Sequence, residues 1–265
     1  MNQRNAQGMT PHARVAHPRR PRRRPLLASV LALAAVSAAH ALPAPELEPY
    51  TARYAVSYRG LSGGEIESTF TRASQPGLWQ YETRAFPNVF GRLAVSGRAH
   101  ELSTLQVTPT GVRPLSFSFD DGAGNRQKDV RLSYDWTRGM LTGSAEGKPL
   151  SYEIEPGTQD TASVQAAMIR ERLAGRKPSS FRIVANGKLR EYRYWLEGTQ
   201  KVTTPLGTFE AEVWANAREG SNRVSKVWHA PELGFVPVQA IQYRKGNPEV
   251  KMQLIRLERP DQGFR

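Results

Sequence analysis

Alternation of apolar and polar side chains with a period of two residues dominates the chain from residue 50 onward. In residues 50–58 the apolar side chains share one face of an extended chain: Tyr50, Ala52, Tyr54, Val56 and Tyr58. This pattern is typical of a β-strand with one buried face. A turn at 60–64 and a second alternating run at 66–71 complete a predicted β-hairpin.

Similar short runs recur along the chain, separated by turns rich in Gly, Pro, Asn and Asp. They cover residues 78–85, 92–107, 115–119, 129–136, 180–185, 188–197, 208–216, 223–229, 235–243 and 250–257. The Asn186-Gly187 pair between two of them is a strong hairpin signal. Successive strands joined by tight turns predict antiparallel pairing of about a dozen strands.

One helix interrupts the strands. Asp160 is the expected N-cap, residues 161–174 are good helix formers, and Gly175 ends the segment. The helix presents an apolar stripe: Val164, Ala167, Met168 and Ile169. We therefore predict a mainly β fold, a strongly curved or barrel-like antiparallel sheet with one central helix packed against it. An open sheet, a closed barrel and two half-barrels flanking the helix all satisfy this pattern.

The N-terminal segment has a different pattern, typical of a secretory signal peptide. A basic run at 14–24 precedes an apolar run at 26–36, and small residues lead to Ala41. We expect residues 1–41 to be cleaved, 42–49 to form a Pro-rich leader, 50–258 to form one β-rich domain and 259–265 to be a loose tail. The apolar run is about half the length of a membrane-spanning helix, so no stable span is expected after cleavage. Periplasmic localisation follows, by either the general secretory or the twin-arginine route.

The net charge without residues 1–41 and the absence of cysteine restrict the possible partners and chemistry of the domain. The chain has a net charge of +13 from 37 basic and 24 acidic residues. Residues 1–41 hold seven of the arginines and no acidic residue, so the remainder has 30 basic and 24 acidic residues, a net charge of +6. The high isoelectric point is therefore partly an export signal, and a nucleic-acid partner is not expected. With no Cys, the domain has neither disulfides nor thiolate chemistry.

Candidate catalytic and metal-binding groups are sparse, so we expect no enzyme activity, cofactor or metal. Beyond the signal segment the histidines are His100 and His229, and no Gly-x-Ser-x-Gly motif accompanies them. The acidic stretch 120–125 lacks the ligand order of a calcium loop and is expected to be a solvated turn. Glu210 and Glu212 alternate with apolar residues and are expected to face solvent.

Aromatic residues are the best candidates for ligand contacts. They recur on strand faces and on a turn-like segment at 86–91, where apolar side chains can plug the end of a curved sheet or cover a ligand. The candidate ligand-binding residues are Tyr54, Tyr58, Phe86, Phe90, Met168, Tyr194, Trp214 and Trp228.

Four blocks of sequence, in order, resemble the domain-of-unknown-function 3108 family. They are Tyr-Ala-Val-Ser-Tyr-Arg-Gly-Leu at 54–61, Gly-Thr-Gln-Asp at 157–160, Thr-Pro-Leu-Gly-Thr-Phe at 204–209, and Val-Trp-His-Ala-Pro-Glu-Leu-Gly-Phe-Val-Pro-Val at 227–238. The resemblance implies an exported bacterial β-rich protein without an assigned activity, so no site residues carry over from it. The last two blocks are also similar to exported carriers whose curved sheet holds a lipid or a lipoprotein acyl chain, an analogy of fold.

Four functions follow from these observations. The first is a non-enzymatic periplasmic protein that binds a lipid-like or amphiphilic envelope component in a curved-sheet cavity. The second is an envelope assembly or scaffold factor that contacts a protein or glycan. The third is a hydrolase built on His100 or His229, and the fourth is an outer-membrane β-barrel. The sequence leaves the oligomeric state open.

Overall fold

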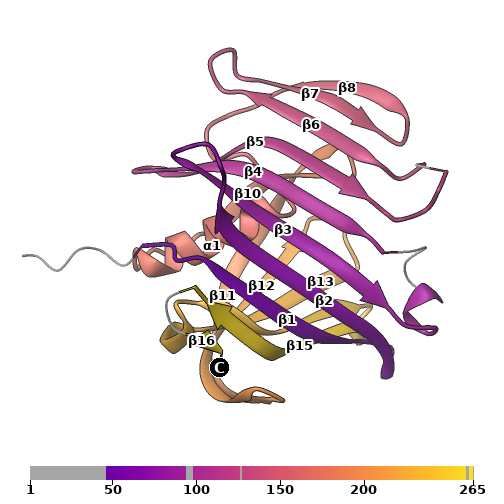
Figure 1. Ribbon diagram of the computed structural model, residues 1–265, viewed down its shortest axis with the longest axis vertical. Helices are drawn as coiled ribbons and strands as arrows, with labels where there is room; N and C mark the ends of the chain where they lie inside the picture. Colours follow the sequence, from indigo (N-terminus) through magenta and orange to yellow (C-terminus); the bar gives the residue numbers. More distant parts are fainter. Residues whose placement is uncertain (1–45, 94–97, 126, 261–262, 265) are drawn as a thin grey trace, which may run out of the picture. The chain divides into compact units, whose positions relative to one another are not determined.

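The alternating segments form one extended, mostly antiparallel sheet in the computed structural model, which describes residues 46–93, 98–125, 127–260 and 263–264. The expected signal peptide at 1–41 and the start of the expected leader lie outside the described residues. The first eight strands form a meander: β1 (Tyr50–Tyr58), β2 (Leu61–Arg72), β3 (Leu78–Pro87), β4 (His100–Thr108), β5 (Gly111–Asp120), β6 (Val130–Asp135), β7 (Met140–Ala145) and β8 (Lys148–Glu153). Each pairs with its neighbours in sequence (Figure 1).

A short strand and the helix separate this meander from a second one. β9 (Gln159–Asp160) pairs in parallel with β10 (Ser180–Ala185), and α1 (Ser163–Leu173) connects them. The chain then continues through β11 (Lys188–Thr204), β12 (Gly207–Arg218), β13 (Arg223–Ala230), β14 (Val236–Arg244), β15 (Asn247–Arg259) and β16 (Gly263–Phe264). One-turn 3₁₀ helices occur at Gly91–Leu93 and Pro231–Leu233.

The two meanders are joined by the first and the last long strands of the chain, β1 and β15. β15 pairs with β1, so the first and last long strands lie side by side in the middle of the strand order (Figure 1). β8 and β9 are the ends of that order, and no ladder connects them, so the sheet is not closed. Side chains narrow this gap, because the Tyr152 hydroxyl of β8 donates a hydrogen bond to the Gly187 carbonyl at the β10–β11 turn, at 2.8 Å.

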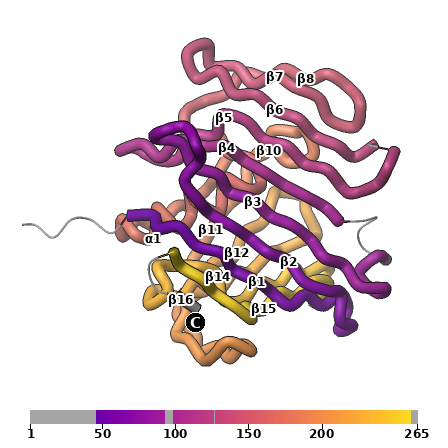
Figure 2. The backbone as a smooth tube through the Cα atoms, viewed as in Figure 1, coloured from indigo at the N-terminus to yellow at the C-terminus, as the bar shows by residue number. Residues whose placement is uncertain are grey.

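The helix packs on the concave side of the sheet, against β4, β5 and β9 (Figure 2 shows the same path as a tube). Burial is spread over much of its surface: Ser163, Val164, Ala166, Ala167, Met168, Ile169 and Arg172 are all buried. Small alanines let it approach the strands closely. The helix begins at Ser163, later than expected, but Asp160 still caps it, because its carboxylate accepts hydrogen bonds from the backbone N–H groups of Ala162 and Ser163.

A second apolar layer covers the convex face near β13–β15. A bulge between Leu196 and Gly198 lets the far half of the β11–β12 hairpin bend over these strands. Its tip is held by hydrogen bonds from Gln253 Nε2 to Thr203 O at 3.2 Å and from Leu206 N to Leu254 O at 3.3 Å. The residues buried on this face include Ala211, Val213 and Trp228.

The expectation of a mainly β protein with one helix is confirmed for the described residues, and four details differ from the expectation. The described sheet has sixteen strands rather than about a dozen, because β7, β8, β9 and β16 were not recognised as strands from their sequence. The run at 92–107 is a strand only from His100 onward. Glu212 does not face solvent: it binds Arg172 on the helix-covered face, because this part of the sheet is covered on both sides. Of the expected loose tail, Arg259 ends β15 and Gly263–Phe264 pair with it as β16.

Candidate functional site

The concave side of the sheet holds a cavity of about 540 Å³ beside the N-terminal end of α1. Strands β1–β4 supply one wall and β10–β15 the other, and Thr161, Val164 and Gln165 form its floor. Small side chains account for the space, because Ser68 and Thr83, which are cross-strand neighbours, occupy inward positions where larger residues would fill it.

Apolar side chains and tyrosines dominate the lining. The apolar members are Ile66, Val164, Ile183, Val227, Pro237, Ala240, Ile241, Val250 and Met252, and the tyrosines are Tyr54, Tyr81, Tyr192 and Tyr194. Apolar walls bind hydrocarbon, whereas tyrosine hydroxyls can serve the polar part of a ligand. The lining therefore suits an amphiphilic molecule.

Hydrogen bonds and ring contacts hold several of these tyrosines in place. Tyr54 donates from its hydroxyl to the Pro237 carbonyl at 3.0 Å, which links β1 to β14. The Tyr50 hydroxyl donates to that of Tyr81 at 3.2 Å. Tyr194 meets Phe181 edge-on, with ring centroids 5.0 Å apart. The walls are preformed, which lowers the entropic cost of binding.

Glu101 also lines the cavity, and Asp160, which is fully buried and does not line it, lies close enough to influence Glu101. Glu101 accepts a short hydrogen bond from the Thr161 hydroxyl, and Asp160 accepts one from Ser103 at 2.8 Å. Burial raises the pKa of Glu101 to about 7, with a further rise from the negative charge of Asp160 and an opposing effect from Thr161. Burial also raises the pKa of Asp160 to about 6, against the hydrogen bonds from Ser163, Ser103 and Ala162. The floor can thus offer a protonated or an ionised carboxyl near neutral pH.

Two other hollows adjoin the helix and are less suited to an apolar ligand. One, of about 360 Å³, lies by the C-terminal half of α1 and carries Glu46, Glu48 and Glu232 among its lining residues. The other, of about 550 Å³, lies near the gap between the sheet ends and is lined largely by polar groups such as Thr108, Glu155 and Arg182.

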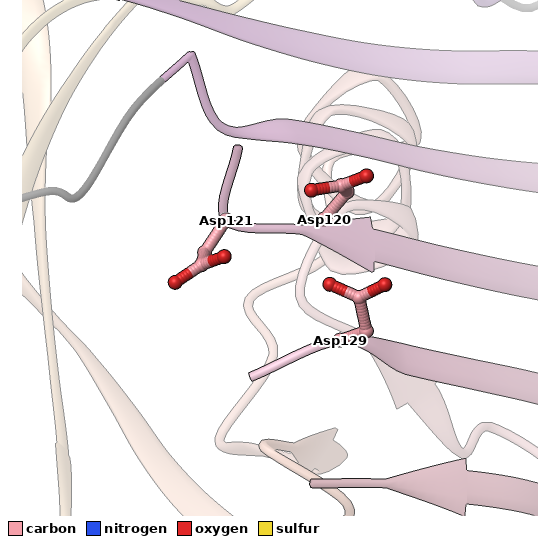
Figure 3. A group of neighbouring side chains, drawn as sticks. All are labelled: Asp120, Asp121 and Asp129. Carbon is pink, nitrogen blue, oxygen red and sulfur yellow. The ribbon is translucent and has the colours of Figure 1, made fainter. Parts of the chain in front are cut away.

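Three aspartates gather at the start of the β5–β6 connection and at its end. Asp120, Asp121 and Asp129 each place one carboxylate oxygen within 4.8 Å of the others, and Figure 3 shows the three side chains at the adjacent ends of β5 and β6, with Asp121 pointing away from Asp120. Local partners already engage them. Asp120 accepts from Gly122 N, Asp121 accepts from Ala123 N and pairs with Lys128 at 3.7 Å, and Asp129 pairs with Arg131 at 3.7 Å. Asp121 is buried, so the stretch 120–125 is not the fully solvated turn that its sequence predicts, and Asp129 Oδ1 is buried without a hydrogen-bond partner among the described residues.

The two histidines occupy unlike surroundings. Within the described residues, His100 Nε2 bonds to a Glu82 oxygen at 2.6 Å, and no Ser or Thr hydroxyl bonds to the ring. His229 is buried, and its Nδ1–H donates to the Phe235 carbonyl at 2.8 Å. Burial lowers the pKa of His229 to about 4, which keeps the ring neutral, and the hydrogen bond to Phe235 fixes the tautomer with the proton on Nδ1.

The structure brings two of the eight candidate residues, Tyr54 and Tyr194, to the cavity wall. Met168 is buried in α1, and Trp214 lies with the Arg172 guanidinium 5.3 Å from its ring centroid. Trp228 packs in the core and donates to Gln200 at 3.1 Å.

The remaining three candidates lie towards one rim of the sheet. Tyr58 is half-buried, with the Arg59 guanidinium 5.1 Å from its ring centroid. Phe86 and Phe90 are 38% and 52% exposed, near the exposed Leu61 and Val89. The structure does not gather these residues around one cavity.

Sequence reasoning missed the acidic floor. Alternation along β4 places Glu101 on the same inward face as the buried residues Ser103 and Leu105. A charged residue on an otherwise buried strand face is unusual, and this was the sequence signal that could have identified Glu101. Asp160 was interpreted only as a helix cap, which it also is.

A family model described as a protein of unknown function, DUF3108, matches residues 53–254. The chain belongs to the DUF3108 family. All residues that line the cavity lie within residues 53–254, the part of this DUF3108 chain that the family model matches. No curated protein matches its sequence.

Among solved structures, this DUF3108 chain is similar to a β-barrel-like protein of the unknown-function family DUF1849 from Brucella abortus. The two share 14% identity with a TM-score of 0.51, over 82% of this chain and 99% of the other. The likeness shows a shared fold.

Two weaker similarities are to a protein of YmcC-like fold from Bacteroides fragilis, provisionally described as exported, and to one from Parabacteroides distasonis, provisionally described as a lipoprotein. Each is 12% identical to this chain and covers 81% of it; the TM-scores are 0.34 and 0.31, with 98% and 97% of the other chains covered. In the described part of the DUF3108 chain, no helix has the length and hydropathy needed to span a membrane.

Proposed function

We propose that this protein is an exported, non-enzymatic binder of an amphiphilic cell-envelope molecule, which it holds between the concave sheet and α1. The observation that carries this proposal is the cavity of about 540 Å³, lined by apolar side chains and tyrosines. Its size falls within the range of about 300–1,000 Å³ that is common for small-molecule sites. The signal-like segment at 1–41 supports an envelope location.

The alternatives have less support. A hydrolase needs a nucleophile beside a base, yet in the described structure His100 pairs with Glu82 alone and His229 is held by a backbone carbonyl. One observation supports a scaffold role: four large apolar side chains are exposed to solvent, namely Leu61, Phe86, Val89 and Phe90. Such a group favours contact with another surface and is compatible with ligand delivery.

The first experiment is extraction of the full-length protein purified from the envelope of its native host, followed by mass spectrometry. We expect one class of amphiphile at about one molecule per chain. Its absence, together with failure to bind an added amphiphile, would contradict the proposal.

A matched pair of variants locates the binding site. Val227 lines the cavity, whereas Val224, three residues earlier on β13, points to the opposite face. Binding is followed by the fluorescence of the neutral probe N-phenyl-1-naphthylamine. We expect Val227→Trp to weaken binding at least about tenfold by filling the cavity, and Val224→Trp to leave it unchanged. Equal affinities in two folded variants would place the probe elsewhere.

A further inference from the structure

A smaller hollow of about 200 Å³ adjoins the cavity at the rim formed by β10–β14. The two hollows share the lining residues Tyr192, Asn216, Ser225 and Gln242, so they lie next to each other. The smaller hollow has three arginines in its lining, Arg190, Arg218 and Arg223.

Strand register explains why the arginines gather there. On β13, Val227, Ser225 and Arg223 succeed one another on the inward face at steps of two residues. On β12, Asn216 and Arg218 follow the same order. The inner surface therefore changes from apolar to neutral polar to cationic over about 13 Å, the length of four residues in a strand.

The positive charge at this rim is largely uncompensated. Among the described residues, no carboxylate pairs with Arg190 or Arg218, and both are half-buried. Arg223 lies 3.6 Å from Glu249, but the same carboxylate also pairs with Arg59 and Arg244 at 3.3 Å each. The single Glu249 carboxylate therefore pairs with three guanidinium groups, and Arg223 shares its negative charge with two other arginines.

We infer that the smaller hollow is an anion subsite, in which Arg190 and Arg218 bind the phosphate or carboxylate head of an amphiphile whose apolar part occupies the larger cavity. Guanidinium groups form paired, charge-assisted hydrogen bonds with both kinds of head. The inference rests on the proposed function and adds the class of ligand: anionic rather than neutral amphiphiles.

The test measures displacement of N-phenyl-1-naphthylamine by three molecules with the same hydrocarbon chain: palmitate, hexadecyl phosphate and hexadecanol. We expect both anions to bind the wild-type protein at least about tenfold more tightly than the alcohol, and the tighter of the two identifies the preferred head group. Raising the salt concentration should narrow this difference.

Variants assign the effect to the subsite. The double variant Arg190→Gln/Arg218→Gln should lose about tenfold in affinity for the anions while its affinity for hexadecanol stays the same. The control is Arg138→Gln, which removes one charge from the exposed β6–β7 turn and should change neither affinity. Circular dichroism and the melting temperature establish that each variant is folded.

The outcomes separate the two proposals. Equal binding of anions and alcohol by the wild-type protein, or an equal loss for both in the double variant, would overturn the anion subsite and leave the amphiphile-binding proposal standing. If the wild-type protein binds none of the three molecules and yields no lipid on extraction, both proposals fail.

Discussion

Arg172 of α1 and Glu212 of β12 form a two-bond ion pair, with Nε–Oε2 and Nη2–Oε1 distances of 2.7 and 2.9 Å. Trp214 donates its indole N–H to the same carboxylate at 2.9 Å. The Arg172 side chain is only 7% exposed. The pair therefore links α1 to β12 in the second half of the sheet, whereas the helix packs against β4 and β5 in the first half.

Replacing Arg172 should test this connection. Arg172→Met leaves the Glu212 carboxylate half-buried without its partner, so we expect a loss of about 3 kcal/mol in the free energy of unfolding, measured by urea denaturation. The double variant Arg172→Met/Glu212→Gln should recover part of it. Three residues beyond the end of α1, Arg176→Met breaks an exposed pair with Glu171 and should cost at most about 1 kcal/mol. Equal effects of the two single variants would contradict a special role for Arg172.

Glu101 should make stability fall as pH rises. Its folded pKa, about 7, exceeds the ordinary value of 4.5, so the folded protein binds more protons than the unfolded chain between these values. The stabilisation is complete below pH 4.5 and is lost as pH rises through about 7. Between about pH 4.5 and 7 we expect Glu101→Gln to reduce this pH-dependent loss of melting temperature, and Glu65→Gln, on the outward face of β2, to leave it unchanged. A pH profile unchanged by Glu101→Gln would refute this role.

His229 should act in the opposite direction at lower pH. Its folded pKa, about 4, lies below the ordinary 6.5, so its contribution to stability is complete above pH 6.5 and is lost as pH falls through about 4. Glu212 and Arg172 are the charged groups that influence it. Nitrogen-15 NMR should show a neutral ring, protonated at Nδ1, down to about pH 4. Titration near pH 6.5 would contradict the buried position.

The contact across the open side of the sheet can be tested with two glycines. Gly187 and Gly147 both have positive φ, 66° and 73°, but a Cβ at Gly187 would lie 2.3 Å from the Ala145 Cβ, whereas one at Gly147 would meet nothing within 4 Å. We expect Gly187→Ala to lower the free energy of unfolding by about 1–3 kcal/mol more than Gly147→Ala. Identical losses would mean that the β10–β11 turn does not touch β7.

The sequence predicted the fold well where one face of a strand is buried and the other is not. Tyr50, Ala52 and Tyr54 are all buried, as their alternation indicated. It predicted β7 and β8 poorly, because Met140–Ala145 contains Gly143 and small polar residues, and β8 is an exposed strand at the end of the sheet. Pairing with neighbours, rather than local propensity, makes these segments strands.

The site was predicted only in part for a related reason. Alternation places Tyr54 and Tyr194 on inward faces, but it does not say which inward residues meet across the sheet. Trp228 illustrates this limit: it is a buried aromatic residue, yet the β11–β12 hairpin covers it on the other face. The long bent hairpin depends on a bulge near Gly198, which a period of two residues does not reveal.

The ladder between β1 and β15 also constrains how the molecule assembles. Because a strand from one end of the chain completes its pairing only with a strand from the other, a partly synthesised polypeptide carries β1 with an unpaired edge. Such distant pairing slows folding and prolongs the time during which that edge can join to another molecule. A chain truncated before Asn247 should therefore aggregate rather than form a smaller stable sheet.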